Sequence, residues 1–137
     1  MHLNAEKNGA KFASNNDLRV FKWGETIRKT KLDELTQIWN VLKGEMHLVG
    51  PRPERPIWTK EFEKSIPHYN QRHLVAPGIT GLAQIKYQYG AGKLDAEQKL
   101  MYDLYYIKNW SLKLELEIIW KTAIFVLTKR KHDLSNF

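Results

Sequence analysis

The chain has 137 residues, a formal net charge of +7 and no cysteine. This length supports one domain with a packed core but not two, and the lack of cysteine excludes a disulfide framework and cysteine-based zinc or redox sites. The positive charge favours anionic partners: nucleic acid, phosphorylated substrates or an acidic membrane surface. The sequence contains no signal peptide and no run of roughly 20 apolar residues, so contact with a membrane is expected at its surface or through a segment outside this chain.

The N-terminal part is predicted to contain a polar arm followed by two helices. Residues 1–17 are rich in Asn, Gly and Ser and are predicted to form a loop, whereas 18–29 can form a short helix. A longer helix is predicted to start after Thr30 and to end at Gly44, which is a typical C-cap residue. Its apolar residues recur at the spacing of one helical stripe: Leu35, Ile38, Trp39 and Leu42.

The middle of the chain is predicted to alternate extended pieces and turns with one helix. Residues 46–50 are expected to be extended and to run into the Pro-Arg-Pro turn at 51–53, because a proline disfavours helix at the residue before it. A short helix is predicted at 57–65. After the Pro-Gly turn at 77–78, residues 80–87 are predicted to form a strand.

Two helices are predicted at the C-terminal end. The first covers roughly 96–109 with Asp95 as its cap, and the second covers 112–128 with Ser111 as its cap. The second helix begins LKLELE, which alternates with period 2, so a strand is an open alternative there. The expected fold class is α/β (α+β, mostly helical): a compact single domain over residues 1–137 with a few short strands.

Asp33 and Glu34 are the first candidate functional residues. Both lie at the predicted start of the helix after Thr30, where a capping box and a favourable interaction with the helix dipole would explain them. The same position suits chemistry, because a carboxylate can act as a covalent nucleophile on phosphorus and its neighbour can bind a hard cation such as Mg²⁺. Adjacent side chains on a helix point about 100° apart, so the two acids can have different roles. From the residues alone, both interpretations stay open.

Three arginines are candidate ligands of phosphate or nucleotide, because the planar guanidinium group grips phosphate oxygens with two hydrogen bonds. Arg28 lies in the basic run RKTK, which is also typical of a solvated surface. Arg52 is held between two prolines that restrict the backbone, and a purely structural turn is the alternative. For Arg72, a surface ion pair is the simpler interpretation.

The segment 112–131 combines bulky apolar residues with a terminal cluster of Lys129, Arg130 and Lys131. One interpretation is an ordinary core helix whose basic end suits the helix dipole. The other is a helix that lies on a membrane surface, with its basic residues at anionic head groups.

Five sequence blocks, LDEL, NVLKG, LVGPRPE, PGITG and DLYYIKN, occur in this order. Together they resemble the signature of bacterial sugar transferases, the polyprenyl-phosphate glycosyl-1-phosphate transferases or monotopic phosphoglycosyl transferases. The resemblance runs from about Asn4 to Thr128. It implies transfer of a sugar-1-phosphate from a nucleotide diphosphate sugar, commonly a UDP-sugar, to a membrane polyprenyl phosphate, with release of UMP. This reaction is the first step in the assembly of exopolysaccharide, O-antigen and other glycans.

The resemblance also implies roles for individual residues. Asp33 would be the nucleophile that takes the phosphosugar covalently, and Glu34 would help to hold Mg²⁺ at the diphosphate. Arg28 and Arg52 would contact phosphate or nucleotide, and Arg72 is a further candidate for such a contact. Family members usually carry an N-terminal membrane-embedded helix. The chain is therefore expected to be a catalytic-domain fragment that lacks this helix and acts at the cytoplasmic face of a bacterial inner membrane.

Two other classes of function are weighed against the transferase. The chain could be a non-catalytic basic module that binds anionic lipid or nucleic acid, or a truncated, inactive transferase fragment. Its basic residues are scattered, and neither a helix-turn-helix nor an RNP-like aromatic motif is visible. Nucleic acid is therefore not expected among the partners, which are predicted to be a UDP-sugar, a polyprenyl phosphate and the membrane surface.

Overall fold

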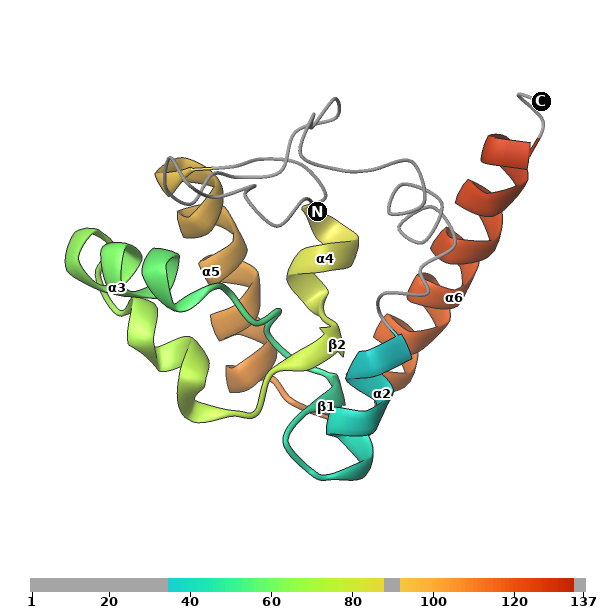
Figure 1. The fold of residues 1–137 in the computed structure, drawn as a ribbon, viewed down its shortest axis with the longest axis horizontal. Coiled ribbons are helices and arrows are strands. Elements are labelled where there is room, and N and C mark those ends of the chain that lie inside the picture. Colours follow the sequence, from blue (N-terminus) through green and yellow to red (C-terminus); the bar gives the residue numbers. More distant parts are fainter. Residues whose placement is uncertain (1–34, 88–91, 135–137) are drawn as a thin grey trace, which may run out of the picture.

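The structure is a computed structural model that describes residues 35–87 and 92–134. Its elements, shown in Figure 1, are α2 (Leu35–Leu42), β1 (His47–Val49), α3 (Pro56–Ser65), the 3-10 helix η2 (Tyr69–Leu74), β2 (Gly78–Thr80), α4 (Leu82–Lys86), α5 (Lys93–Lys108) and α6 (Leu112–Leu134). This confirms the predicted mostly helical α+β class. The predicted loop at 1–17 and the predicted helix at 18–29 lie outside the described residues.

The two strands form a small parallel sheet that brings two distant segments together. His47 pairs with Gly78 and Val49 pairs with Thr80. Parallel strands need a crossover connection, and here α3 and η2 lie within that connection. As a result, the Pro-Arg-Pro turn after β1 lies beside the PGITG segment that contains β2.

Helix α5 is the central support of the fold. Figure 1 shows it between α3 on one side and α4 on the other. It contributes Ala96 and Leu100 to a core cluster that also contains Phe62, Ile66 and Tyr69. Further along the same helix, Tyr106 joins a second cluster with Val49, Leu82 and Ile118. A single helix therefore connects the α3–η2 region with the strands and α6.

The predicted strand at 80–87 is wrong, because β2 ends at Thr80 and the next residues form α4. Gly81 has extended backbone and acts as the N-cap of α4. Its carbonyl oxygen accepts hydrogen bonds from the backbone N–H groups of Gln84 and Ile85. The residues of α4 include alanine, leucine, glutamine and lysine, which favour helix once Gly81 has redirected the chain.

The predicted cap of α5 is also wrong. The helix begins at Lys93 with Gly92 as its N-cap, so Asp95 lies within the first turn. The Asp95 carboxylate instead accepts a hydrogen bond from the Tyr87 hydroxyl at 2.5 Å. This contact joins the end of α4 to the start of α5 and explains why the carboxylate does not cap its own helix.

Other predicted elements are confirmed. The helix predicted at 57–65 is α3, which has Pro56 in its first turn, and Gly44 has the positive φ of +77° that a C-cap glycine adopts after α2. The Ser111 hydroxyl accepts a hydrogen bond from the backbone N–H of Leu114 at 3.2 Å, as its predicted capping role requires. The alternative strand at the start of α6 is wrong, because the whole of Leu112–Leu134 is helical.

Helix α6 exposes a stripe of large apolar side chains. Its members are spaced by three or four residues, as neighbours on one helix face are, and all are exposed: Leu116, Trp120, Ile124 and Leu127. Within the residues that the structure describes, no helix is both long enough and apolar enough to cross a membrane.

Candidate active site

The segment from Val49 to Arg52 is fixed by a hydrogen bond at every residue. Its four partners come from three other parts of the chain. In chain order, the contacts join Val49 O to the Tyr106 hydroxyl at 3.3 Å, Gly50 N to Thr80 O at 2.9 Å, Pro51 O to Gly78 N at 2.9 Å, and Arg52 O to Arg72 Nη2 at 2.8 Å. Residues 49–52 therefore form a rigid backbone segment, called the platform below. The candidate phosphate ligand Arg52 is its last residue.

Three glycines allow the platform to pack directly against the β2 region. A Cβ atom on Gly78 would lie 2.1 Å from Gly50 N, and one on Gly81 would lie 2.2 Å from Gly50 O. A Cβ atom on Gly50 would lie 2.7 Å from Ala76 O. Because the neighbours are backbone atoms that cannot move aside cheaply, only glycine fits at these positions.

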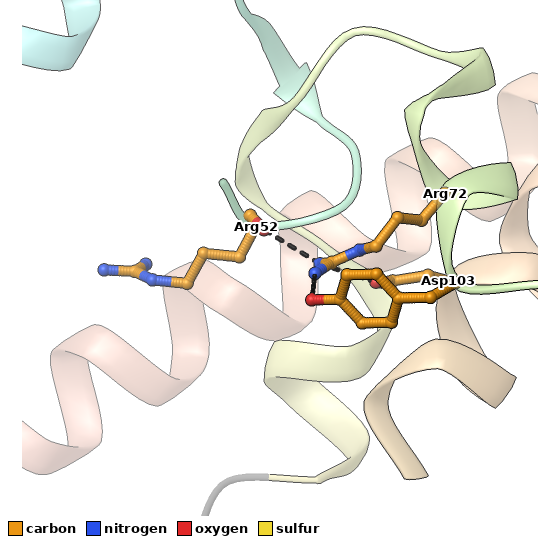
Figure 2. A network of polar contacts seen from close by, with 4 residues as sticks. Arg52, Arg72 and Asp103 are labelled. Carbon is orange, nitrogen blue, oxygen red and sulfur yellow. Dashed lines mark hydrogen bonds and ion pairs between the residues drawn. The ribbon is translucent and has the colours of Figure 1, made fainter. Parts of the chain in front are cut away.

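Arg72 forms an ion pair, as expected, but the pair is buried and does not lie at the surface. Its Nη2 atom lies 2.8 Å from Asp103 Oδ2, and the two side chains are only 5% and 2% exposed. The Nη1 atom donates to the Tyr69 hydroxyl at 2.6 Å. Figure 2 shows how Arg72 lies between Asp103 and the backbone of Arg52. The 3-10 helix turns Arg72 inward against α5, which the sequence pattern of a short polar segment did not indicate.

The Arg52 side chain points away from the buried contacts of Arg72 (Figure 2). It is exposed, and Figure 2 shows its guanidinium group directed away from Arg72 and Asp103. The structure therefore connects the two predicted arginines through the backbone of Arg52 and not through their side chains. The Arg52 side chain thus lies at the surface, whereas the Arg72 guanidinium contacts groups inside the protein.

Asp103 and Tyr106 are site residues that the sequence interpretation missed. They lie three residues apart on α5, so they share one face of the helix. The Tyr106 hydroxyl lies between Val49 O and Glu115 Oε1, which is 2.9 Å away, and burial raises the pKa of Tyr106, which keeps this donor protonated. A usable signal was present: Asp103 is the one charged residue in the otherwise apolar run 100–107 of the helix predicted at 96–109, where an unpaired acid would be costly.

Burial raises the pKa of Asp103 from 3.8 to about 6, against the opposing effect of the Arg72 guanidinium. The other charges that face it are Glu54, which also raises this pKa, and Lys99, which lowers it. The carboxyl group of Asp103 therefore binds its proton more tightly in the folded protein than in the unfolded chain. The stability that comes from proton binding is complete at low pH and is lost as the pH rises through the folded pKa.

The variant Asp103→Asn tests this pH dependence, because asparagine cannot titrate. We expect the free energy of unfolding of the wild type, relative to that of the variant, to fall by up to about 3 kcal/mol from about pH 4 to about pH 6. Urea unfolding at several pH values measures this difference, and the titration of all other groups cancels. A difference in the free energy of unfolding that rises with pH would show that the attraction of Arg72 lowers the pKa of Asp103 more than burial raises it.

The remaining predicted site residues, Arg28, Asp33 and Glu34, lie outside the described residues. The helix that follows Glu34 in the sequence, α2, is joined to β1 by a tight connection. There the Asn40 carbonyl oxygen accepts hydrogen bonds from the backbone N–H groups of Glu45 at 2.9 Å and Met46 at 3.2 Å. The roles predicted for the two acids and for Arg28 stay predictions.

Comparison with known proteins identifies the family of this chain. The bacterial sugar transferase family matches residues 1–129. The chain is 48% identical over 128 residues to a UDP-N-acetylgalactosamine-undecaprenyl-phosphate N-acetylgalactosaminephosphotransferase of Aeromonas hydrophila, which covers 93% of this chain and 30% of that protein. It is 45% identical over 120 residues to a UDP-glucose:undecaprenyl-phosphate glucose-1-phosphate transferase of Xanthomonas campestris pv. campestris, covering 86% of this chain and 25% of that protein.

A third relative has a different sugar in its name. The undecaprenyl-phosphate galactose phosphotransferase of Salmonella typhimurium is 42% identical over 118 residues, covering 86% of this chain and 24% of that protein. The chain thus spans less than a third of the length of these relatives. The family match over residues 1–129 contains all five sequence blocks that resemble the sugar transferase signature. The chain belongs to the bacterial sugar transferase family.

Proposed function

We propose that the chain catalyses the transfer of a sugar-1-phosphate from a UDP-sugar to undecaprenyl phosphate, with release of UMP. The relatives' names describe UDP-sugar and undecaprenyl-phosphate substrates, and the family match extends over most of this chain. The structural observation that carries the proposal is the exposed Arg52 side chain on a backbone fixed at both of its neighbouring peptide groups. A rigidly held guanidinium group suits a diphosphate, because its planar fork can donate two parallel hydrogen bonds.

In the proposed mechanism, a carboxylate oxygen of Asp33 attacks the phosphorus atom that carries the sugar. The bond from this phosphorus to the UMP oxygen breaks, and UMP leaves with the bonding electrons. A phosphate oxygen of the lipid then attacks the same phosphorus and breaks its bond to Asp33, which regenerates the carboxylate. Arg52 and Arg28 would hold phosphate oxygens in position during both displacements.

We also propose that Glu34 holds Mg²⁺ when the ion is bound. The ion would offset negative charge on the diphosphate, and the carboxylate oxygen of Glu34 is the kind of ligand that Mg²⁺ prefers. Among residues 35–87 and 92–134, no group of three or more acidic or histidine side chains could hold a metal ion. The proposed ligand therefore rests on the resemblance of the LDEL block to the family.

The exposed apolar stripe of α6 favours a membrane surface as the place of this reaction. Burial of such a stripe in the boundary between head groups and acyl chains stabilises a helix that lies on a bilayer. The acceptor would be delivered from the same surface. The position at the cytoplasmic face of a bacterial inner membrane stays part of the proposal.

The experiment for the proposed function is release of UMP from a panel of UDP-sugars, with Mg²⁺ and undecaprenyl phosphate in anionic vesicles. We expect one or a few UDP-sugars to support release. Without the lipid phosphate, release is expected to stop at about one UMP per protein molecule, and repeated turnover is expected only when the lipid phosphate is present. Co-sedimentation of the chain with these vesicles tests the surface contact in the same sample. No release by the folded chain, together with DNA binding that weakens steeply with salt, would instead favour a non-catalytic basic module.

A further inference from the structure

We propose that Arg72 and Asp103 are positioning residues, which hold the backbone of Arg52 so that its side chain meets the phosphate groups of the nucleotide sugar in one orientation. This inference rests on the function proposed above. Arg72 was predicted from the sequence as a phosphate or nucleotide ligand in its own right. The contacts of its guanidinium group favour an indirect role.

Hydrogen bonds hold both peptide groups beside the Arg52 Cα atom. The peptide group before it is held by the hydrogen bond from Gly78 N to Pro51 O at 2.9 Å. The peptide group after it is held by the bond from Arg72 Nη2 to Arg52 O at 2.8 Å. With both peptide planes fixed, the φ and ψ angles of Arg52 are fixed, and so is the direction in which its side chain leaves the backbone.

A side chain holds the Arg52 carbonyl oxygen. Arg52 lies between the end of β1 and the start of α3, outside any helix or strand, so no regular backbone ladder supplies a donor there. The donor is the side chain of Arg72, which lies 20 residues further along the chain. The guanidinium group of Arg72 contacts Arg52 O, Asp103 and the Tyr69 hydroxyl from one planar group. The single ammonium group of a lysine does not offer this fork geometry.

The buried charge of Arg72 is compensated by Asp103. A buried cation without a partner destabilises the fold by several kcal/mol, and Arg72 is 5% exposed. Asp103 compensates this charge from α5, where Leu100 and Tyr106 on either side of it are anchored in the two core clusters. The same helix therefore holds both ends of the platform: Tyr106 contacts Val49 O directly, and Asp103 acts on Arg52 O through Arg72.

A double-mutant cycle distinguishes positioning from direct contact with the substrate. We expect Arg72→Lys to lower kcat/KM for UMP release roughly 10- to 100-fold, since one charged hydrogen bond is lost. In the Arg52→Ala background, the same change is expected to have less than about a threefold effect, because no side chain remains to be oriented. Losses that multiply in the double mutant would overturn the proposal and favour a separate phosphate contact by Arg72.

Ala96→Gly is the matched control for a general loss of stability. It weakens α5 two turns before Asp103 by removing a helix-favouring methyl group. Ala96 packs in the core cluster that contains Tyr69, but it takes part in none of the hydrogen bonds that hold the platform or Arg72. Its effect on kcat/KM is expected to be small and to be the same in the wild-type and Arg52→Ala backgrounds. If Arg72→Lys does not fold, the pair Arg72→Met with Asp103→Leu removes both buried charges together and loses the same contact to Arg52 O.

Hydrogen–deuterium exchange gives a second test that does not depend on activity. Because Pro51 and Pro53 have no N–H group, peptides that cover residues 47–54 report on this segment through the Gly50 amide, which donates to Thr80 O. This amide is expected to exchange faster in Arg72→Lys and in the charge-free pair, but not in Ala96→Gly. Unchanged exchange in this segment would overturn the proposal even if the enzyme is active. If no UDP-sugar yields UMP, the proposed function fails, and the exchange experiment still decides whether Arg72 holds the Arg52 backbone.

Discussion

Replacement of Asp33 by asparagine is expected to abolish UMP release, with a loss on the order of 10⁴-fold or more. Asparagine has nearly the same shape, but its neutral amide oxygen is too weak a nucleophile to attack phosphorus. It remains a good residue at the start of a helix, so the folded state is expected to persist. UMP release from the best UDP-sugar, together with thermal unfolding of both proteins, measures the two effects.

This variant also separates the two interpretations of the acidic pair. If Asp33 only favours the start of its helix, its replacement would change the stability by less than about 1 kcal/mol and leave the activity intact. Asp95→Asn is the matched control, because Asp95 also lies in the first turn of a helix. Its replacement is expected to leave UMP release within about twofold of the wild type. Full activity in Asp33→Asn would rule out Asp33 as the nucleophile.

Replacement of Gly78 by alanine is expected to have the largest effect on stability, at least about 4 kcal/mol or complete loss of folding. The added methyl group would lie 2.1 Å from Gly50 N and 2.6 Å from both the Gly50 Cα and Thr80 O. These are backbone atoms, and the nearest two belong to Gly50, which directly follows β1, so relief requires Gly50 to separate from β2. The separation would also break the hydrogen bond from Gly78 N to Pro51 O. Urea unfolding measures the loss.

Gly44→Ala is the control for this substitution. Gly44 has a positive φ of +77°, but a Cβ atom there meets nothing within 4 Å. Its replacement is expected to cost only about 1 to 2 kcal/mol, the strain of a left-handed backbone. Equal losses in the two variants would contradict the account, because they would show that close packing of β1 against β2 contributes little.

The parts of the fold that followed from the sequence are those with a strong local signal. The helix predicted at 57–65 is α3, Gly44 ends α2, and Ser111 caps α6. The strand at 80–87 was predicted wrongly because α4 has only 5 residues, too few for helical and extended periodicities to be distinguished. The close approach of Gly81 to Gly50, which sets the turn before α4, is a long-range contact that no local pattern reveals.

The candidate site, like the fold, could be predicted only in part from the sequence. Arg52 is conspicuous because two prolines flank it. The burial of Arg72 was not predictable from its own segment, since its partner Asp103 lies on another helix and its hydrogen-bond acceptor is a backbone oxygen beside β1. The sequence shows which residue types are available for chemistry. Which of them contact substrate and which hold other residues in place depends on packing between distant segments.

The most direct test of the proposed mechanism is the mass of the protein after incubation with its UDP-sugar and Mg²⁺ in the absence of acceptor lipid. We expect an added sugar-phosphate on the peptide that contains Asp33, absent in Asp33→Asn and removed when undecaprenyl phosphate is supplied. UMP release that proceeds only with both substrates present, and without any adduct on the protein, would contradict this mechanism and indicate a single direct displacement.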